Sequence, residues 1–419
     1  MKRLLPISAV IIIIFMFAAL GFAGDGKLQK TPRLKQEKDP NIMVWKCRAK
    51  PYMDQQNNTA DYWMCTVDIK DKKLNYGLYW KPSKECTSQK VKDKYAELVE
   101  EREEFLEWAE LHNEQLKVEM EYIKTQHFLI GWNIKILPCV RRTRVQYGLP
   151  QNPAQLNTLE ALHIYAMRAE DCWDHHCRDF KMDRMSERDR VTVYWLKNDK
   201  QKETVLKNSP GYKGDVRVNR LVAATNPVIW ERLHDDWRHD ERIKFNHVHL
   251  IGMAVHDKWE HKKVPWPINW VTVGYGHRME YLMFKDSIVR DFQETDVSDT
   301  MWGHEHWRYR IFEMIYKEHT IPSFTDIMTR NHETYKWIDL LFCFGYIDYM
   351  IFNDQEKWLK FQRAQRACKK TDEAMEKVFN WSPLMFEEMF KEWVLAYYPA
   401  SREEDERWVY KPNKPRKFK

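Results

Sequence analysis

Four histidines in two neighbouring segments are the residues whose type and spacing could do chemistry. The stretch KFNHVHLIGMAVH contains His247, His249 and His256, and the segment WVTVGYGHRMEYL that follows contains His277. A zinc ion that activates water needs two imidazoles one helical turn apart, a carboxylate beside the first of them and a third ligand from a later segment. Because positions i and i+4 share one face of a helix, a helix followed by a returning segment suits such a site.

The elements that must position these histidines are expected to alternate between strand and helix. Period-two runs rich in β-branched and aromatic residues predict strands, and a long run with helical spacing after an Asn-Thr pair predicts a capped helix. The patterns predict strands at 127–137, 191–199 and 216–225 and a helix at 157–180. Such an order predicts a compact α+β unit over residues 125–299.

This order of elements resembles the peptidase MA-like gluzincins, zinc metallopeptidases in which a His-Glu-x-x-His helix is followed by a Trp-x-x-Glu-Gly-x-Ala segment. TQHFLIGWNI is similar to the family's opening strand, and ALHIYAMRAEDCWDHHCRDF is similar to its first helix. The resemblance covers residues 125–399 and extends to the family's closing helices. It implies an α+β fold with a gluzincin-like core, a small sheet with packed helices, and then an all-helical C-terminal subdomain.

Carried across residue by residue, the resemblance implies that the zinc site is degenerate. With His249 on the second zinc histidine, the first histidine falls on Phe245, the general base on Asn246 and the downstream ligand on Val273, while Gly274 keeps the family's glycine. Phe and Val cannot bind zinc, and Asn cannot accept a proton from water as a carboxylate does. The resemblance therefore implies a vestigial site, no catalytic residue, no bound metal and no cofactor.

A second alignment of the His-Glu-x-x-His motif also lacks a complete ligand set. With His247 as the first ligand, the second histidine falls on Ile251. The leading hypothesis is accordingly a non-catalytic protein whose cleft binds something or supports an assembly. The residues expected to lie in this cleft are His247, Trp266, Trp270, Gly274 and His277.

Two other interpretations stay open. One is a metal-dependent peptidase or hydrolase with a relocated site, in which zinc would be the cofactor. The histidines available for it are His247, His249, His256, His261, His277, His304 and His306. The other is a glycan or cell-wall binding module, because exposed aromatic rings mark binding sites. It would use Trp259, Trp266 and Trp270, whose alternative role is to fill the core.

The amino-terminal segment predicts export. Lys2 and Arg3 precede an apolar run over residues 4–22, and small residues suit cleavage after Ala23. Residues 1–23 are therefore expected to be a signal peptide or, if uncleaved, an N-terminal membrane anchor. The protein is expected to be secreted, periplasmic or anchored facing outside the cytoplasm, with an unknown protein or cell-envelope ligand as partner.

The eight cysteines fit that compartment, because disulfides persist outside the cytoplasm and the number is even. The sequence does not give their connectivity. Cys172 and Cys177 are five residues apart in the predicted helix, a rise of about 7.5 Å, which exceeds the roughly 7 Å that a disulfide tolerates between Cα atoms. They are expected not to bridge each other.

The remaining segments complete the expected domain organisation. They are an irregular cysteine-containing region at 24–89, a long amphipathic helix at 90–124, the helical subdomain at 300–399, where Ser382 and Pro383 begin a helix, and a basic tail at 400–419. The net charge of +6 arises from 68 basic and 62 acidic residues, a near balance that gives no reason to expect nucleic acid as a partner.

Overall fold

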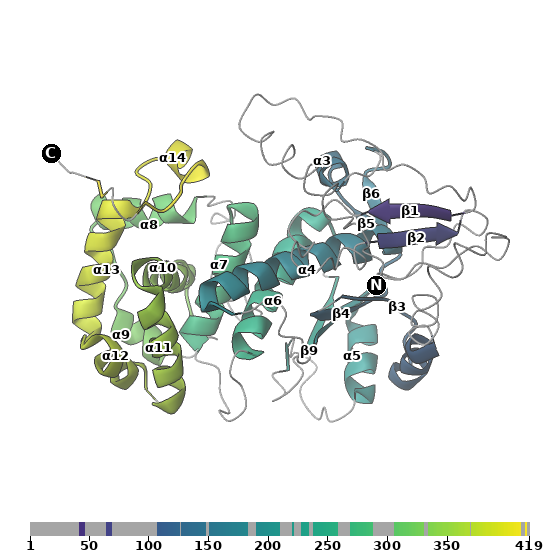
Figure 1. Ribbon diagram of the computed structural model, residues 1–419, viewed down its shortest axis with the longest axis horizontal. Coiled ribbons are helices and arrows are strands. Elements are labelled where there is room, and N and C mark those ends of the chain that lie inside the picture. Colours follow the sequence, from purple (N-terminus) through teal and green to yellow (C-terminus); the bar gives the residue numbers. More distant parts are fainter. Residues whose placement is uncertain are drawn as a thin grey trace, which may run out of the picture. The chain divides into compact units, whose positions relative to one another are not determined.

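The computed structural model describes part of the chain (Figure 1). The described residues are 42–46, 64–68, 107–125, 127–147, 151–182, 190–209, 220–221, 228–233, 238–258, 269–287, 306–330, 334–368, 370–411 and 415–416. The predicted signal segment at 1–23, most of the region at 24–89, and both Trp259 and Trp266 lie outside the described residues.

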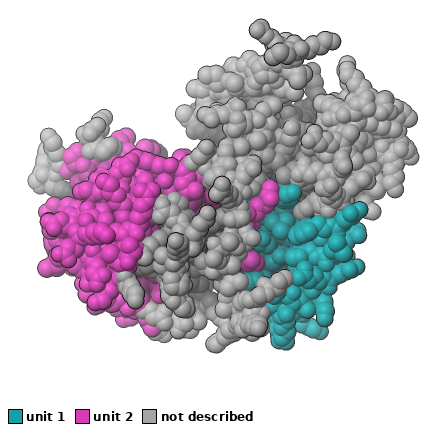
Figure 2. All heavy atoms as spheres, turned by 60° about the horizontal axis from the view of Figure 1, so that its bottom comes forward, with its two compact units in different colours: residues 1–170, 192–219, 230–240 teal, residues 171–191, 220–229, 241–419 magenta. Residues whose placement is uncertain are grey.

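The chain divides into two compact units, coloured separately in Figure 2. The first contains residues 1–170, 192–219 and 230–240, and the second contains residues 171–191, 220–229 and 241–419. The first unit contains most of the described strands and the second contains most of the described helices, so the α+β class predicted from the sequence is confirmed at this level.

The larger sheet has five strands in the order β3-β4-β7-β9-β8. They span Glu121–Lys124 (β3), Phe128–Trp132 (β4), Val191–Leu196 (β7), Val228–Arg232 (β9) and Arg220–Leu221 (β8). β3 pairs antiparallel with β4, and β8 pairs antiparallel with β9. Two-stranded sheets join β1 (Ile42–Lys46) with β2 (Met64–Asp68) and β5 (Ile136–Pro138) with β6 (Gln155–Asn157).

The predicted strands at 127–137 and 191–199 are confirmed in part. The first contains β4 and then β5, and the second ends at Leu196, because Asn198 caps the helix that follows. The side-chain oxygen of Asn198 accepts a hydrogen bond from the backbone N–H of Gln201 at 3.0 Å, as in an N-cap. This helix, α5, spans Asp199–Asn208.

The prediction of one helix over residues 90–124 is wrong at its carboxyl end. Residues 107–116 are helical, Lys117 has a left-handed φ of 58°, and β3 then begins. Asn113 explains the stop, because its amide side chain bonds both the N–H and the C=O of Met120 at 3.1 and 2.9 Å. Leu116 is buried at the end of the helix, whereas Met120 is buried in the segment that follows and Ile123 in β3.

The helix predicted at 157–180 is confirmed as α4, which spans Thr158–Phe180. Its amino terminus is capped as expected, with Asn157 Oδ1 accepting a hydrogen bond from the N–H of Glu160 at 2.9 Å. A short helix, α3 (Arg141–Gln146), precedes it.

The second unit is built from helices. They are α6 (Asp240–Lys258), α7 (Asn269–Phe284), α8 (Trp307–Tyr316), α9 (Phe324–Thr329), α10 (Trp337–Asn353), α11 (Gln355–Ala367), α12 (Thr371–Phe379), α13 (Pro383–Tyr397) and α14 (Arg402–Glu406). The start predicted at Ser382 and Pro383 is confirmed, with Ser382 Oγ accepting a hydrogen bond from the N–H of Met385.

Helix α10 forms the centre of this unit. Every residue from Asp339 to Ile351 is buried, as expected of a helix that is largely apolar on all sides. It packs closely on α7, where a Cβ on Gly274 would lie 2.6 Å from the carbonyl oxygen of Cys343. Among the described residues no helix is both long and apolar enough to cross a membrane.

The described thiols are unbridged. Cys139, Cys172, Cys177, Cys343 and Cys368 form no disulfide with one another. The expectation that Cys172 and Cys177 do not pair agrees with this, because α4 contains both. The thiols of Cys47, Cys65 and Cys86 lie outside what the structure describes, so for these three the expectation of disulfides stays a prediction.

Candidate functional site: a buried His-His-Glu cluster

Helices α6 and α7 run antiparallel against each other and carry the histidines singled out above. The Phe245 and Phe284 rings have centroids 4.7 Å apart, and the His256 and Thr272 side chains meet at 3.3 Å. Residue numbers increase along α6 in the direction in which they decrease along α7. The two helices therefore form an antiparallel hairpin in which each residue of α6 has a fixed neighbour on α7.

Two glycines bring these helices close together. A Cβ on Gly252 would lie 2.7 Å from Met279 Cγ, and one on Gly276 would lie 2.8 Å from Cε1 of His249. The His249 ring therefore lies against the backbone of α7 in space that only a glycine leaves open. This close approach positions His249 beside the next turn of α7.

That turn supplies two further groups, and together they form a cluster of possible metal ligands. His249, His277 and Glu280 offer one ligand atom each, and these atoms all lie within 4.8 Å of one another. Each of the three residues is 0% exposed. His277 and Glu280 are i and i+3 on one helix and therefore face the same side.

Hydrogen bonds link the three side chains through one carboxylate oxygen. Glu280 Oε1 accepts from Nδ1 of His249 at 2.7 Å and from Nδ1 of His277 at 3.0 Å. The Ser287 hydroxyl lies 2.9 Å from the same nitrogen of His277. His249 Nε2 is buried and has no hydrogen-bond partner among the described residues.

The carboxylate is ionised in this setting. Burial alone would raise the pKa of Glu280, but the hydrogen bonds from His249 and His277 outweigh it and lower the pKa to about 2. A buried anion is costly unless a cation or strong donors compensate it. The cluster can meet that need in two ways, with one imidazole protonated or with a bound metal cation.

The structure does not bring together the four positions of the vestigial site. Phe245 lies against Phe284, whereas Val273 lies eleven residues earlier in α7, a rise of about 16 Å. His249 is one helical turn from Phe245 and meets Glu280. Asn246, the expected remnant of the general base, is buried in α6.

The residues expected to line a cleft lie in different surroundings. His247 is buried, Gly274 packs on α10, and His277 belongs to the cluster. Trp270 is fully buried, its indole N–H donates to Thr371 Oγ1 at 3.2 Å, and its ring packs edge-on against Phe324. Trp270 therefore fills the core and presents no surface to a sugar.

Glu280 is the cluster residue that sequence reasoning missed. The signal was the spacing His-x-x-Glu in GHRME, since i and i+3 residues meet on a helix face and such pairs hold metals in helical bundles. The alignment with the gluzincin motif pointed to Val273 as the downstream ligand position instead. The partner of this pair, His249, was identified from the sequence.

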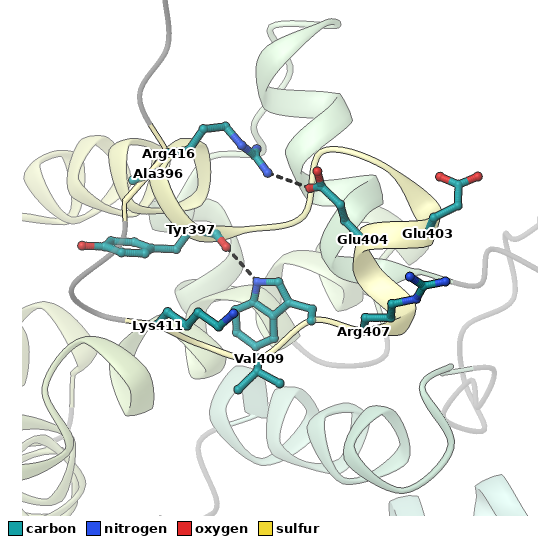
Figure 3. A pocket seen from close by; sticks show the side chains of 9 residues that line it. Ala396, Tyr397, Glu403, Glu404, Arg407, Val409, Lys411 and Arg416 are labelled. Atoms are coloured by element: carbon teal, nitrogen blue, oxygen red, sulfur yellow. Dashed lines mark hydrogen bonds and ion pairs between the residues drawn. The ribbon is translucent and has the colours of Figure 1, made fainter. Parts of the chain in front are cut away.

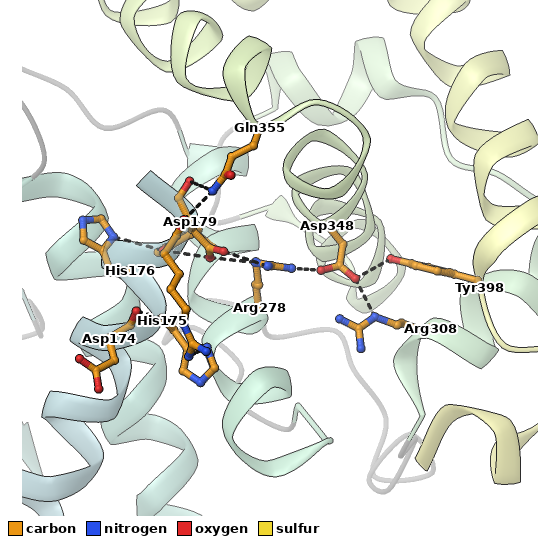
Figure 4. A network of polar contacts seen from close by, with 11 residues as sticks. Asp174, His175, His176, Asp179, Arg278, Arg308, Asp348, Gln355 and Tyr398 are labelled. Atoms are coloured by element: carbon orange, nitrogen blue, oxygen red, sulfur yellow. Dashed lines mark hydrogen bonds and ion pairs between the residues drawn. The ribbon is translucent and has the colours of Figure 1, made fainter. Parts of the chain in front are cut away.

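A second buried polar network lies in the helical unit (Figure 4). Arg278 holds Asp179 with Nε and Nη2, each at 3.1 Å, and bonds Asp348 with Nη1. Asp348 also accepts from Arg308 at 2.7 Å and from Tyr398 at 3.1 Å. Two arginines and two carboxylates balance in charge, so this network is a neutral support for the helix packing.

A surface pocket lies near the carboxyl terminus (Figure 3). Its volume is about 550 Å³, and Trp408 forms part of the lining with its indole N–H donating to the carbonyl of Tyr397 at 2.8 Å. The charged lining residues are Glu403, Glu404, Arg407, Lys411 and Arg416, and Arg416 pairs with Glu404 at 2.8 Å. Three cations and two carboxylates line the pocket, so its lining carries charges of both signs.

No protein-family model matches the chain, and a comparison with curated proteins finds no similar sequence. The likeness to gluzincins therefore rests on the order of elements and motifs in the sequence.

Proposed function

We propose that this protein is an exported, non-catalytic relative of the gluzincin peptidases that binds a partner protein or a cell-envelope ligand, or supports an assembly there. The observation that supports this is the complete burial of the His249–Glu280–His277 cluster. A zinc peptidase needs a coordination position open to water and substrate, and a carboxylate base beside it. In the cluster the one carboxylate is already occupied by two imidazoles.

The residues at the gluzincin motif positions also support a non-catalytic role. Phe245 and Val273 carry no ligand atom, and Asn246 cannot act as a general base. The α6–α7 hairpin keeps its packing through aromatic and glycine contacts that need no metal. A helical hairpin of this kind can persist as a scaffold after catalysis is lost.

A peptidase assay tests the proposal. Purified protein supplemented with zinc is expected to leave casein and mixed peptides intact, at the same level as Glu280→Gln and His256→Gln. His256→Gln is a matched control, because His256 lies on the same helix, is buried, and bonds Gln362 and Thr272 outside the cluster.

A hydrolase with a relocated site is the second candidate, and the composition of the cluster favours it. Two histidines and one glutamate are the ligand set of several catalytic zinc enzymes. This candidate replaces the first if the wild type and His256→Gln cleave peptides while Glu280→Gln does not.

Export is tested separately. The mature chain is expected either to begin near Gly24 or to remain tethered through residues 4–22. Cell fractionation with N-terminal sequencing distinguishes these two forms. Full-length chain recovered as soluble cytoplasmic protein contradicts export.

A further inference from the structure

We infer that His249, His277 and Glu280 bind one divalent transition-metal ion, zinc by preference, which holds α6 and α7 together as a structural centre. This goes beyond the proposed function, since an ion sealed in the core stabilises the hairpin whether or not the chain descends from peptidases. It also departs from the expectation of no metal, which considered the family positions alone.

The spacing of the ligand atoms fits a small ion. Zinc binds imidazole nitrogen and carboxylate oxygen at about 2.0–2.2 Å, which requires neighbouring ligand atoms to lie roughly 3–3.6 Å apart in a tetrahedral arrangement. The two Nδ1 atoms lie 2.7 and 3.0 Å from Glu280 Oε1, and the three ligand atoms span at most 4.8 Å. The spacing of the ligand atoms is therefore close to what such an ion requires, because each nitrogen–oxygen separation would have to lengthen by less than about 1 Å.

The donor types select the class of metal. Two imidazoles with one carboxylate suit zinc and its neighbours, whereas calcium and magnesium take oxygen ligands almost entirely. A divalent ion also compensates the buried Glu280 carboxylate.

The helices that supply the ligands are closely packed. His249 is fixed against Gly276, and α7 is fixed by its close packing on α10 at Gly274. A site whose ligands are held in place by packing loses little entropy when it takes up an ion. Complete burial distinguishes this site from a catalytic zinc site, which keeps one coordination position open to water and substrate.

The alternative occupant of this position is a proton. An imidazolium on either histidine would also neutralise Glu280, and the cluster would then be a hydrogen-bonded core triad with no metal. The two alternatives differ in metal content, in ligand-field absorption and in sensitivity to chelators.

The experiment loads the purified full chain with Co²⁺ as a spectroscopic probe. The wild type is expected to bind one ion, to show the visible absorption of a four- or five-coordinate site with nitrogen ligands, and to release cobalt on addition of one equivalent of Zn²⁺. His277→Gln and Glu280→Gln are expected to weaken binding by at least about tenfold. His256→Gln is expected to bind as the wild type does.

Thermal unfolding of the wild type alone gives an independent measurement, which keeps the test valid if a cluster variant fails to fold. The midpoint is expected to fall on removal of metal by a chelator and to recover with Zn²⁺, because an ion that binds only the folded state stabilises it. Protein that shows no cobalt spectrum and a chelator-independent midpoint overturns the inference in favour of the protonated triad. The metal experiments and the peptidase assay test different claims. Absence of metal binding overturns only the metal site, whereas peptidase activity overturns only the proposed non-catalytic function.

Discussion

The imidazole of His249 lies where a side chain on Gly276 would have to be, since an added Cβ would be 2.8 Å from Cε1 and 2.9 Å from Nδ1 of that ring. The same Nδ1 donates to Glu280. Gly276 therefore controls whether His249 can reach the carboxylate.

Gly276→Ala is expected to destabilise the protein. The added methyl displaces His249, and overpacking of this kind costs about 1–3 kcal/mol, which exceeds the gain of up to about 1 kcal/mol in helix propensity. Chemical denaturation measures the loss, and NMR signals of the imidazoles report the displacement of His249.

Gly252→Ala is the matched control for this substitution. It perturbs the same helix crossing through Met279 Cγ and the Cα of Gly276, which would lie 2.7 and 3.3 Å from the added Cβ, and the His249 ring is not among its three nearest atoms. Loss of stability in both variants with a shifted His249 signal only in Gly276→Ala supports the assignment. An unshifted signal in Gly276→Ala contradicts it.

The sequence predicted the elements of this region more fully than their register. Caps at Asn157 and Ser382 and the helical spacing of the C-terminal segments identified α4 and α13 nearly to the residue, because capping and periodicity are local. The register of α6 on α7 depends on Gly252 and Gly276, whose role is visible only once the two helices meet. The alignment with the gluzincin motif therefore pointed to Val273, whereas the turn of α7 that contacts His249 contains Glu280.

The error over residues 107–124 has a similar cause. Leu116, Met120 and Ile123 recur at helical spacing, which predicts continuation of the helix. A side chain–backbone bond from Asn113 to Met120 competes with the helix and turns the chain. Periodicity alone cannot reveal such a bond, because the three apolar residues are buried in either arrangement.

Glu170→Gln is expected to flatten the acid limb of the stability profile. Glu170 is fully buried and binds both the backbone N–H and Nδ1 of His127, at 3.1 and 2.7 Å. Burial raises the pKa of Glu170, but the interactions with His127 outweigh it, and the pKa is lowered overall.

The direction of this pH effect follows from the linkage between protonation of Glu170 and folding. A carboxyl group with a folded-state pKa below its unfolded value stabilises the protein above the unfolded pKa, and this stabilisation is lost as the pH falls through the folded pKa. The wild type should therefore lose stability steeply below about pH 4, and Glu170→Gln, less stable at neutral pH, should lose it less steeply. Denaturation at a series of pH values measures both curves, and parallel acid limbs would exclude this role.

Asp348→Asn is expected to be among the most destabilising single substitutions in the helical unit. The change removes one of two buried carboxylates that balance Arg278 and Arg308, and an uncompensated buried charge costs about 3–5 kcal/mol. Glu203→Gln is a chemically matched control, because its pair with Lys207 is exposed and such pairs contribute about 0–1 kcal/mol. Equal losses in the two variants, measured by denaturant unfolding, contradict the proposed importance of the network.

Native thiol labelling is expected to separate the cysteines by burial. Cys172 and Cys177 are buried on α4, and burial raises the pKa of the Cys172 thiol well above its ordinary value, so little reactive thiolate forms. Cys368 is partly exposed and should react first with iodoacetamide. After unfolding, Cys172 and Cys177 should each take one label, because five residues of helix separate them by about 7.5 Å, beyond disulfide reach. Mass spectrometry of the digest measures this, and a peptide crosslinked between them would mean that α4 ends before Cys177.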